Sequence, residues 1–125
     1  MEQAKINLTE AEWNVMECLW EGAPRTGREI IDWLKERKGW SRSTTLTLLR
    51  RLEEKDAVCA EHSGSVKTFY PKITRECAAL QEAEHFLDRV YHGSLGMMVS
   101  AFTKKQALSK EEIQELYDIL EEIEK

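Results

Sequence analysis

The sequence predicts a mainly α-helical fold with a small antiparallel β-hairpin, divided into two domains. Apolar residues recur at helical spacing over most of the 125 residues. Two short strand-like segments flank a Ser-Gly-Ser turn and predict the hairpin. Charge is also unevenly placed: Lys/Arg and Asp/Glu number twelve each over residues 1–72, but six against eleven over residues 73–125. We therefore expect one domain at residues 1–72 and a second at residues 73–125.

Two helices are expected near the start of the chain. Thr9 and Glu12 match a capping box, in which each side chain accepts a hydrogen bond from the other residue's backbone N–H. The spacing that follows predicts a helix over about residues 10–21. After an Ala-Pro break, Thr26 can cap a second helix that ends before Gly39. Their apolar faces are Trp13, Met16, Leu19 and Trp20 in the first helix, and Ile30, Ile31 and Leu34 in the second.

A third helix is predicted from Arg42 to about Lys55, with Ser41 as its cap. Its inward-facing stripe consists of Thr45, Leu48, Leu49 and Leu52. The solvent side then holds Thr44, Thr47, Arg50 and Arg51.

The hairpin follows the third helix. Its strands are predicted at Val58–His62 and Val66–Tyr70, and Pro71 ends the second strand. Three helices and then a two-stranded hairpin, with the third helix basic, is the element order of a winged helix-turn-helix. The first domain is therefore predicted to be a winged helix.

The second domain is predicted to be helical. Helical spacing runs from Arg75 to Tyr91, a shorter segment follows over about residues 94–102, and Ser109 with Glu112 caps a last helix. These helices carry more apolar surface than about 50 residues can bury alone. We expect this apolar surface to be buried against a second copy of the chain in a homodimer. The alternative is that it packs onto the winged domain. The expected dimerisation residues are Phe86, Val90, Ile113, Leu116, Leu120 and Ile123.

The stretch from Arg37 to Arg51 carries five basic residues and no acidic one, although the net charge of the chain is -5. Serine and threonine are mediocre helix formers, so their abundance here indicates contacts made elsewhere. Short hydroxyl side chains let a helix approach base edges while arginines reach phosphates. Double-stranded DNA is favoured over an ordinary solvated face. The expected DNA-binding residues are Arg42, Ser43, Thr44, Thr47, Arg50 and Arg51, with Lys67 either a further phosphate contact or an ordinary surface lysine.

Other functional classes find no support in the sequence. Cys18, Cys59 and Cys77 lack the short spacing of a metal site, so we expect three free thiols and no cofactor. Free thiols are typical of proteins in the reducing cytoplasm, which is the expected location of this protein. No signal peptide or membrane-length apolar run is present, so no membrane association is expected. Without a phosphate loop or nucleophile motif, an enzyme is not expected. The remaining alternative is a winged-helix adaptor that binds other proteins.

Four segments taken in order resemble a known family. They are LTEAEWNVMECLW, WSRSTTLTLLRRLEEK, the hairpin end Phe69-Tyr70-Pro71 and LSKEEIQELYDIL. Together they are similar to the bacterial penicillinase-repressor family, which includes repressors of β-lactamase, methicillin-resistance and copper-homeostasis genes. The resemblance implies a homodimeric transcriptional repressor that binds a palindromic operator and blocks transcription. It also implies that Thr44, Thr47 and Arg51 lie near bases and phosphates.

The chain departs from the family pattern at three places. In the family, antibiotic-responsive members are cleaved between an Asn and a Phe through a sensor-linked protease. In this sequence Ala101 precedes Phe102 where those members have Asn. The two residues are therefore a candidate cleavage region, and such a protease is a candidate partner. Asp56 replaces the usual Gly after the third helix, where a left-handed residue is expected. No paired cysteines follow Cys77, which disfavours copper sensing.

Overall fold

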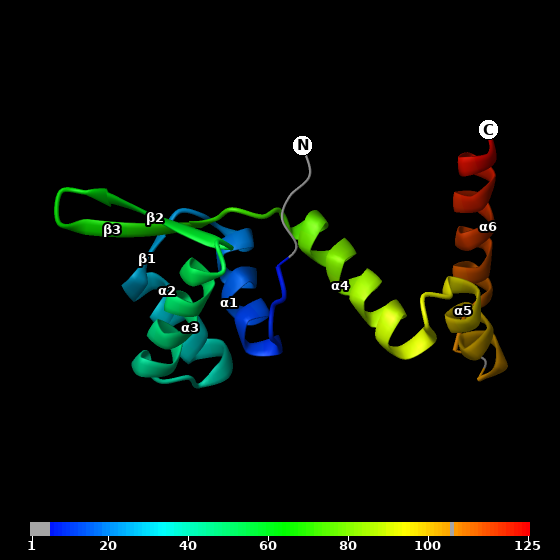
Figure 1. Ribbon diagram of the computed structural model, residues 1–125, viewed down its shortest axis with the longest axis horizontal. Helices are drawn as coiled ribbons and strands as arrows, with labels where there is room; N and C mark the ends of the chain where they lie inside the picture. The colour runs from blue at the N-terminus through cyan, green and yellow to red at the C-terminus, as the bar shows by residue number, and fades with distance from the viewer. Residues whose placement is uncertain (1–5, 106) are drawn as a thin grey trace. The chain divides into compact units, whose positions relative to one another are not determined.

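The computed structural model describes residues 6–105 and 107–125, and the chain forms two compact units that divide between Glu82 and Ala83. The predicted mainly α-helical fold with a small antiparallel sheet is confirmed. Helix α4 begins in the first unit and ends in the second (Figure 1). In chain order the elements are α1 (Glu10–Glu21), β1 (Arg25–Thr26), α2 (Gly27–Lys38), α3 (Arg42–Glu54), β2 (Val58–Ser63), β3 (Val66–Pro71), α4 (Arg75–Tyr91), α5 (Leu95–Lys104) and α6 (Lys110–Glu124).

Side-chain caps fix where the helices begin. Thr9 Oγ1 accepts a hydrogen bond from the Glu12 N–H at 3.1 Å, and the Glu12 carboxylate accepts one from the Thr9 N–H at 2.8 Å. The predicted box at α6 forms in the same way. The cap Thr26 is also confirmed, and Glu29 completes a box there that goes beyond the prediction. These bonds satisfy backbone N–H groups that a helix start otherwise leaves without partners.

Strand β1 adds a third strand to the predicted hairpin. It pairs antiparallel with β3, so that Arg25 lies opposite Phe69 and Thr26 opposite Thr68. The sheet order is β1-β3-β2. Two residues are too few to show the alternation that identifies a strand in a sequence.

The turn of the hairpin is tighter than predicted. Ser63 pairs with Val66, so both belong to the strands and only Gly64 and Ser65 connect them. Gly64 adopts a φ of 63°, a left-handed conformation that glycine enters without steric cost. Two-residue turns with positive φ match the twist of antiparallel strands, which explains the glycine at this position.

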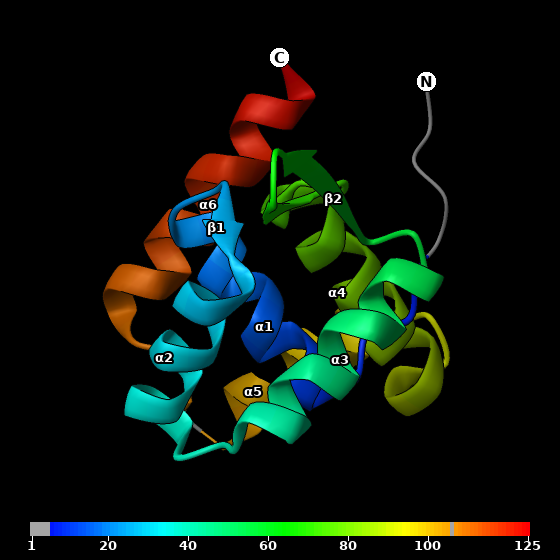
Figure 2. The same ribbon diagram turned by 90° about the vertical axis from the view of Figure 1, so that its left-hand side faces the viewer.

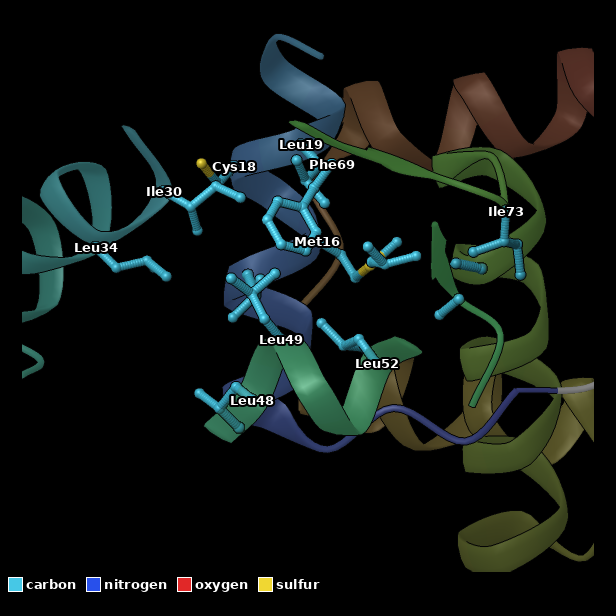
Figure 3. Packing of buried hydrophobic residues seen from close by; sticks show 14 residues of the cluster. Met16, Cys18, Leu19, Ile30, Leu34, Leu48, Leu49, Leu52, Phe69 and Ile73 are labelled. Carbon is cyan, nitrogen blue, oxygen red and sulfur yellow. The ribbon is translucent and has the colours of Figure 1, made fainter. Parts of the chain in front are cut away.

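The core of the first unit lies among its first three helices and the sheet. In Figure 2, α1 lies between α2 and α3, and Figure 3 shows side chains from α2, α3 and β3 converging on α1. Burying each large aliphatic side chain contributes about 1.5–3 kcal/mol, so this cluster accounts for much of the stability. Its largest fully buried apolar side chains are Met16, Leu19, Ile30, Leu34, Leu49 and Leu52.

Two tryptophans close the core beside the start of α4. The Trp13 and Trp20 rings pack edge to face with centroids 5.1 Å apart, in line with their predicted packing role. Trp20 Nε1 donates a hydrogen bond to the Ile73 carbonyl oxygen at 2.9 Å. Ile73 and Ala78 are buried, so the compact unit continues past Lys72 into α4.

The residue after α3 has the expected left-handed conformation. Asp56 has a φ of 64°, and its carboxylate lies 2.7 Å from Lys72 Nζ. Short polar side chains tolerate this region better than most residues. The replacement of Gly by Asp is therefore accommodated, and the chain reverses there into β2.

The second unit consists of exposed helices. His92 and Gly93, both with positive φ, end α4 where predicted, and Ser94 caps α5. None of the residues described in this unit is buried. Its exposed large apolar residues are Phe86, Val90, Leu95, Met97, Phe102, Ile113, Leu116, Tyr117, Ile119, Leu120 and Ile123.

Thr45→Val should stabilise the first unit. Thr45 is fully buried, and its hydroxyl has no hydrogen-bond partner among the described residues. Valine keeps the branched shape and removes the unsatisfied group, so we expect a gain of about 1 kcal/mol. Urea unfolding measures this gain, with Thr47→Val at a half-buried position of the same helix as control. An unchanged or lower free energy of unfolding in Thr45→Val would contradict the assignment.

Candidate nucleic-acid interface

Helix α3 has one buried and one exposed side. The predicted inward stripe is confirmed, because Thr45, Leu48, Leu49 and Leu52 are all buried. On the other side Thr47 is half-buried, and Figure 2 shows no element of the first unit in front of the helix. The exposed predicted DNA-binding residues of α3 are Arg42, Ser43, Thr44, Arg50 and Arg51.

Three hydroxyl groups gather at the start of α3. Ser41 Oγ accepts a hydrogen bond from the Thr44 N–H at 3.2 Å and donates one to Thr44 Oγ1 at 3.0 Å. Ser43 Oγ lies 3.2 Å from Ser41 Oγ. A hydroxyl can donate one bond and accept two, so this cluster keeps capacity for external partners. It lies at a helix N-terminus, where the helix dipole favours anions such as phosphate.

The arginines of α3 are available for an external anion. Arg50 lies 4.0 Å from Glu54, and both side chains are about 70% exposed, so this pair contributes little. Within the described part of the chain, neither Arg42 nor Arg51 makes an ion pair. Their guanidinium groups can therefore bind phosphate without breaking an existing pair.

Lys67 of the hairpin lies beside the C-terminal part of α3. Its Nζ is 3.7 Å from the Glu53 carboxylate and 5.1 Å from the centroid of the Phe69 ring. Both charged side chains are more than a third exposed, so water screens this pair. The fold thus places Lys67 beside the C-terminal end of α3, which also carries the predicted DNA-binding residues Arg50 and Arg51.

An ion pair between the buried Glu12 and the exposed Lys55 fixes the C-terminal end of α3 against the start of α1. The Glu12 side chain is 1% exposed and pairs with Lys55 Nζ, which also donates to the Asn7 carbonyl oxygen at 2.6 Å. Burial alone would raise the pKa of Glu12, but hydrogen bonds from Lys55 and Thr9 outweigh it and hold this pKa below its ordinary value of 4.5. The charged carboxylate is therefore part of the folded structure.

The exposed side of α3 contains one residue that the sequence analysis missed. Leu46 is 39% exposed, whereas the neighbouring Leu48 and Leu49 are 5% and 2% exposed. The helical spacing indicated this exposure, because Leu46 falls outside the inward stripe of α3. It stands three residues after Ser43 and four before Arg50, which places it on the same face as both.

The predicted dimerisation and cleavage residues all belong to α4, α5 and α6. The six dimerisation residues are between 37% and 75% exposed. Ile119, which was not predicted, is exposed on α6 as well. In α5, Ala101 is half-buried and Phe102 is 44% exposed.

The cysteines do not form a site with other ligating groups. Cys18 is buried, and this burial raises the pKa of its thiol to about 11, whereas Cys59 and Cys77 are only half-buried. The described residues contain no group of three His, Cys, Asp or Glu able to hold a metal ion. Among the described helices, none has the length and apolar character needed to cross a membrane.

Known proteins of one family resemble the chain. A family model described as penicillinase repressor matches residues 8–122. The penicillinase repressor of Bacillus licheniformis is 36% identical over 115 residues, which cover 92% of this chain and 90% of that protein. The methicillin resistance regulatory protein MecI of Staphylococcus aureus (strain N315) is 28% identical over 120 residues, covering 96% and 98%.

A solved structure of a family relative matches 61% of the chain. It is the solution structure of the Bacillus licheniformis BlaI monomeric form in complex with the blaP half-operator. The match has a TM-score of 0.55 and 28% identity, and covers 61% of this chain and 93% of that chain. Together with the element order, this match confirms the predicted winged-helix fold.

Glu12→Gln should destabilise the first unit by roughly 1–3 kcal/mol at neutral pH, because Lys55 loses its charged partner. A carboxylate whose pKa is lower in the folded state than in the unfolded state stabilises the fold at pH values above its unfolded-state pKa. This stabilisation is lost as the pH falls through its folded-state pKa. The difference between wild type and variant should therefore shrink below pH 4.5.

Urea unfolding across this pH range measures the effect. Glu17→Gln serves as control, because its ion pair with Arg75 is largely exposed and should contribute less. A difference that stays constant as the pH falls would rule out the buried carboxylate as its source.

Proposed function

The chain belongs to the penicillinase repressor family and is a DNA-binding transcriptional repressor, and we propose that it acts as a homodimer on a palindromic operator. The family is one of transcriptional repressors and not of enzymes. The observation that best supports the proposal is the exposed side of α3, where hydroxyl groups stand beside arginines of which Arg42 and Arg51 make no ion pair with a described residue. A chain with net charge -5 concentrates positive charge where phosphates would lie.

The exposed side of α3 divides into two kinds of contact. Arginines are long and charged and suit phosphate oxygens, whereas short hydroxyl side chains suit base edges in the major groove. In the proposed complex Lys67 exchanges its exposed pair with Glu53 for a backbone phosphate. The proposed phosphate contacts are Arg42, Arg50, Arg51 and Lys67, and the proposed base contacts are Ser43, Thr44 and Thr47.

The second unit supports the proposed dimer through its exposed apolar residues. No described residue there is buried, although α6 carries an apolar side along its length. A helix with one apolar face gains most of its stability by packing that face against something. A second copy offers an identical face and would also bring a second α3 to the other half of a palindrome.

Release from the operator follows from weakening this dimer. Two linked DNA contacts benefit from effective concentration, and separate copies lose that benefit. We propose that a sensor-linked protease acts at Ala101–Phe102. This bond lies inside α5, so local opening of that helix would have to precede cleavage.

Arg51→Ala should weaken binding to operator and random duplexes alike, because a phosphate contact does not depend on sequence. The slope of log affinity against log salt should fall by about one. Thr47→Ala should instead lose roughly 1–3 kcal/mol on the operator and little on random DNA. Fluorescence anisotropy over a salt series measures both effects. Lys125→Ala, which removes one positive charge at the chain end, is the control.

Equal losses on both duplexes for the two variants would contradict this division of contacts. If the affinity of the wild type for DNA does not fall steeply as the salt concentration rises, the DNA-binding surface proposed on α3 is wrong.

Leu116→Ser combined with Leu120→Ser should produce monomers that bind the operator poorly, because two exposed apolar contacts of the proposed seam are lost. Sedimentation measures the mass, and DNA binding is measured on the same samples. The control combines Glu115→Ser with Glu122→Ser, which lie on the opposite side of α6 by helical spacing. A mass equal to that of the control, with α6 still helical by circular dichroism, would exclude this seam.

A further inference from the structure

Leu46 is an apolar residue in the middle of a polar, positively charged surface. On a helix its nearest surface neighbours are three and four positions away, which are Arg42, Ser43 and Arg50 on the exposed side. All three are polar and exposed. A single leucine at 39% exposure is ordinary on a protein surface, but this one lies at the centre of the helix face proposed to contact DNA, so its side chain would meet whatever binds there.

Packing within the first unit does not occupy the Leu46 side chain. The other three leucines of α3 are buried in the core. Leu46 belongs neither to the buried core cluster nor to the half-buried apolar residues that pack against it. Its side chain therefore remains available for a partner that approaches the exposed side of α3.

The surroundings of Leu46 determine which partner fits. Another copy of α3 would bring its own arginines against these arginines, and the like charges would repel. DNA brings phosphates to the arginines and base edges to the centre of the helix face. In the major groove, the base edges present hydrogen-bonding groups and one apolar group, the 5-methyl group of thymine.

We propose that Leu46 recognises a thymine in each operator half-site by packing its side chain against the thymine 5-methyl group. Leu46 is then a specificity-determining residue of α3, next to the proposed base contacts Ser43 and Thr47. This inference rests on the proposed function, because it requires α3 to enter the major groove. It adds a chemical preference for one base, which the hydroxyl side chains alone do not provide.

The test begins with the preferred duplexes that the full chain selects from a random library. In a selected duplex each thymine is replaced in turn by deoxyuridine, which removes the methyl group and keeps the hydrogen bonds of the base pair. One thymine per half-site should weaken wild-type binding by about fourfold when replaced, the value expected for one buried methyl-sized group. Leu46→Ala should bind less tightly than wild type and be insensitive to that same replacement.

Controls separate this contact from other effects. Thymines elsewhere in the duplex should affect wild type and Leu46→Ala equally. Leu46→Gln keeps a long side chain and replaces its apolar end, so it should also lose sensitivity to the methyl group. Thermal unfolding should show both variants folded, because Leu46 is not part of the core.

The outcomes distinguish the inference from the function on which it rests. If no duplex is enriched, sequence-specific DNA binding fails and the inference fails with it. If a duplex is enriched but no thymine replacement weakens wild-type binding, the thymine contact alone is overturned. It is also overturned if every replacement weakens wild type and both variants to the same extent.

Discussion

The proposed DNA-facing surface depends on a single constraint, which is that α3 must also close the core of the first unit. Leu48, Leu49 and Leu52 are at most 5% exposed, and they fix the rotation of the helix about its axis. A shift by one residue would turn the helix by about 100° and bring core leucines to the surface. The ion pair of the buried Glu12 with Lys55 then fixes the end of the helix. Core packing, and not DNA, thus decides which side chains of α3 face outward.

Charge separates the tasks of the two parts of the chain. Residues 73–125 carry an excess of acidic groups, and a phosphate backbone repels them, whereas the exposed arginines of α3 attract it. The acidic side chains of α6 share their helix with an exposed apolar side. In the proposed dimer, DNA and the partner copy therefore bind to different helices. The affinity between the two copies of the proposed dimer can therefore change without any change in the proposed DNA-facing residues.

Sequence patterns predicted the features that depend on residues close together in the chain. Caps at Thr9, Thr26, Ser41 and Ser109 and the inward stripe of α3 follow from spacing and side-chain type, and all are confirmed. Strand β1 was missed because only its pairing with β3 makes it a strand. Leu46 was missed because outward positions were assigned by their polar residues. The Glu12 and Lys55 pair joins residues far apart in the chain, so no local pattern could reveal it.

A single α3 has few contacts with which to distinguish one sequence from another. The proposed base-facing residues are few, and a mismatched base pair costs about 1–3 kcal/mol, while a genome offers very many competing sites. Two copies held in register add their discrimination free energies, so the ratio between operator and random DNA is roughly squared. The apolar helices of the second unit would then contribute to sequence recognition without touching a base. For the same reason, a signal that separates the proposed copies need not reach α3, because each separated copy keeps its own DNA-contacting residues and loses the affinity and selectivity that two linked copies have together.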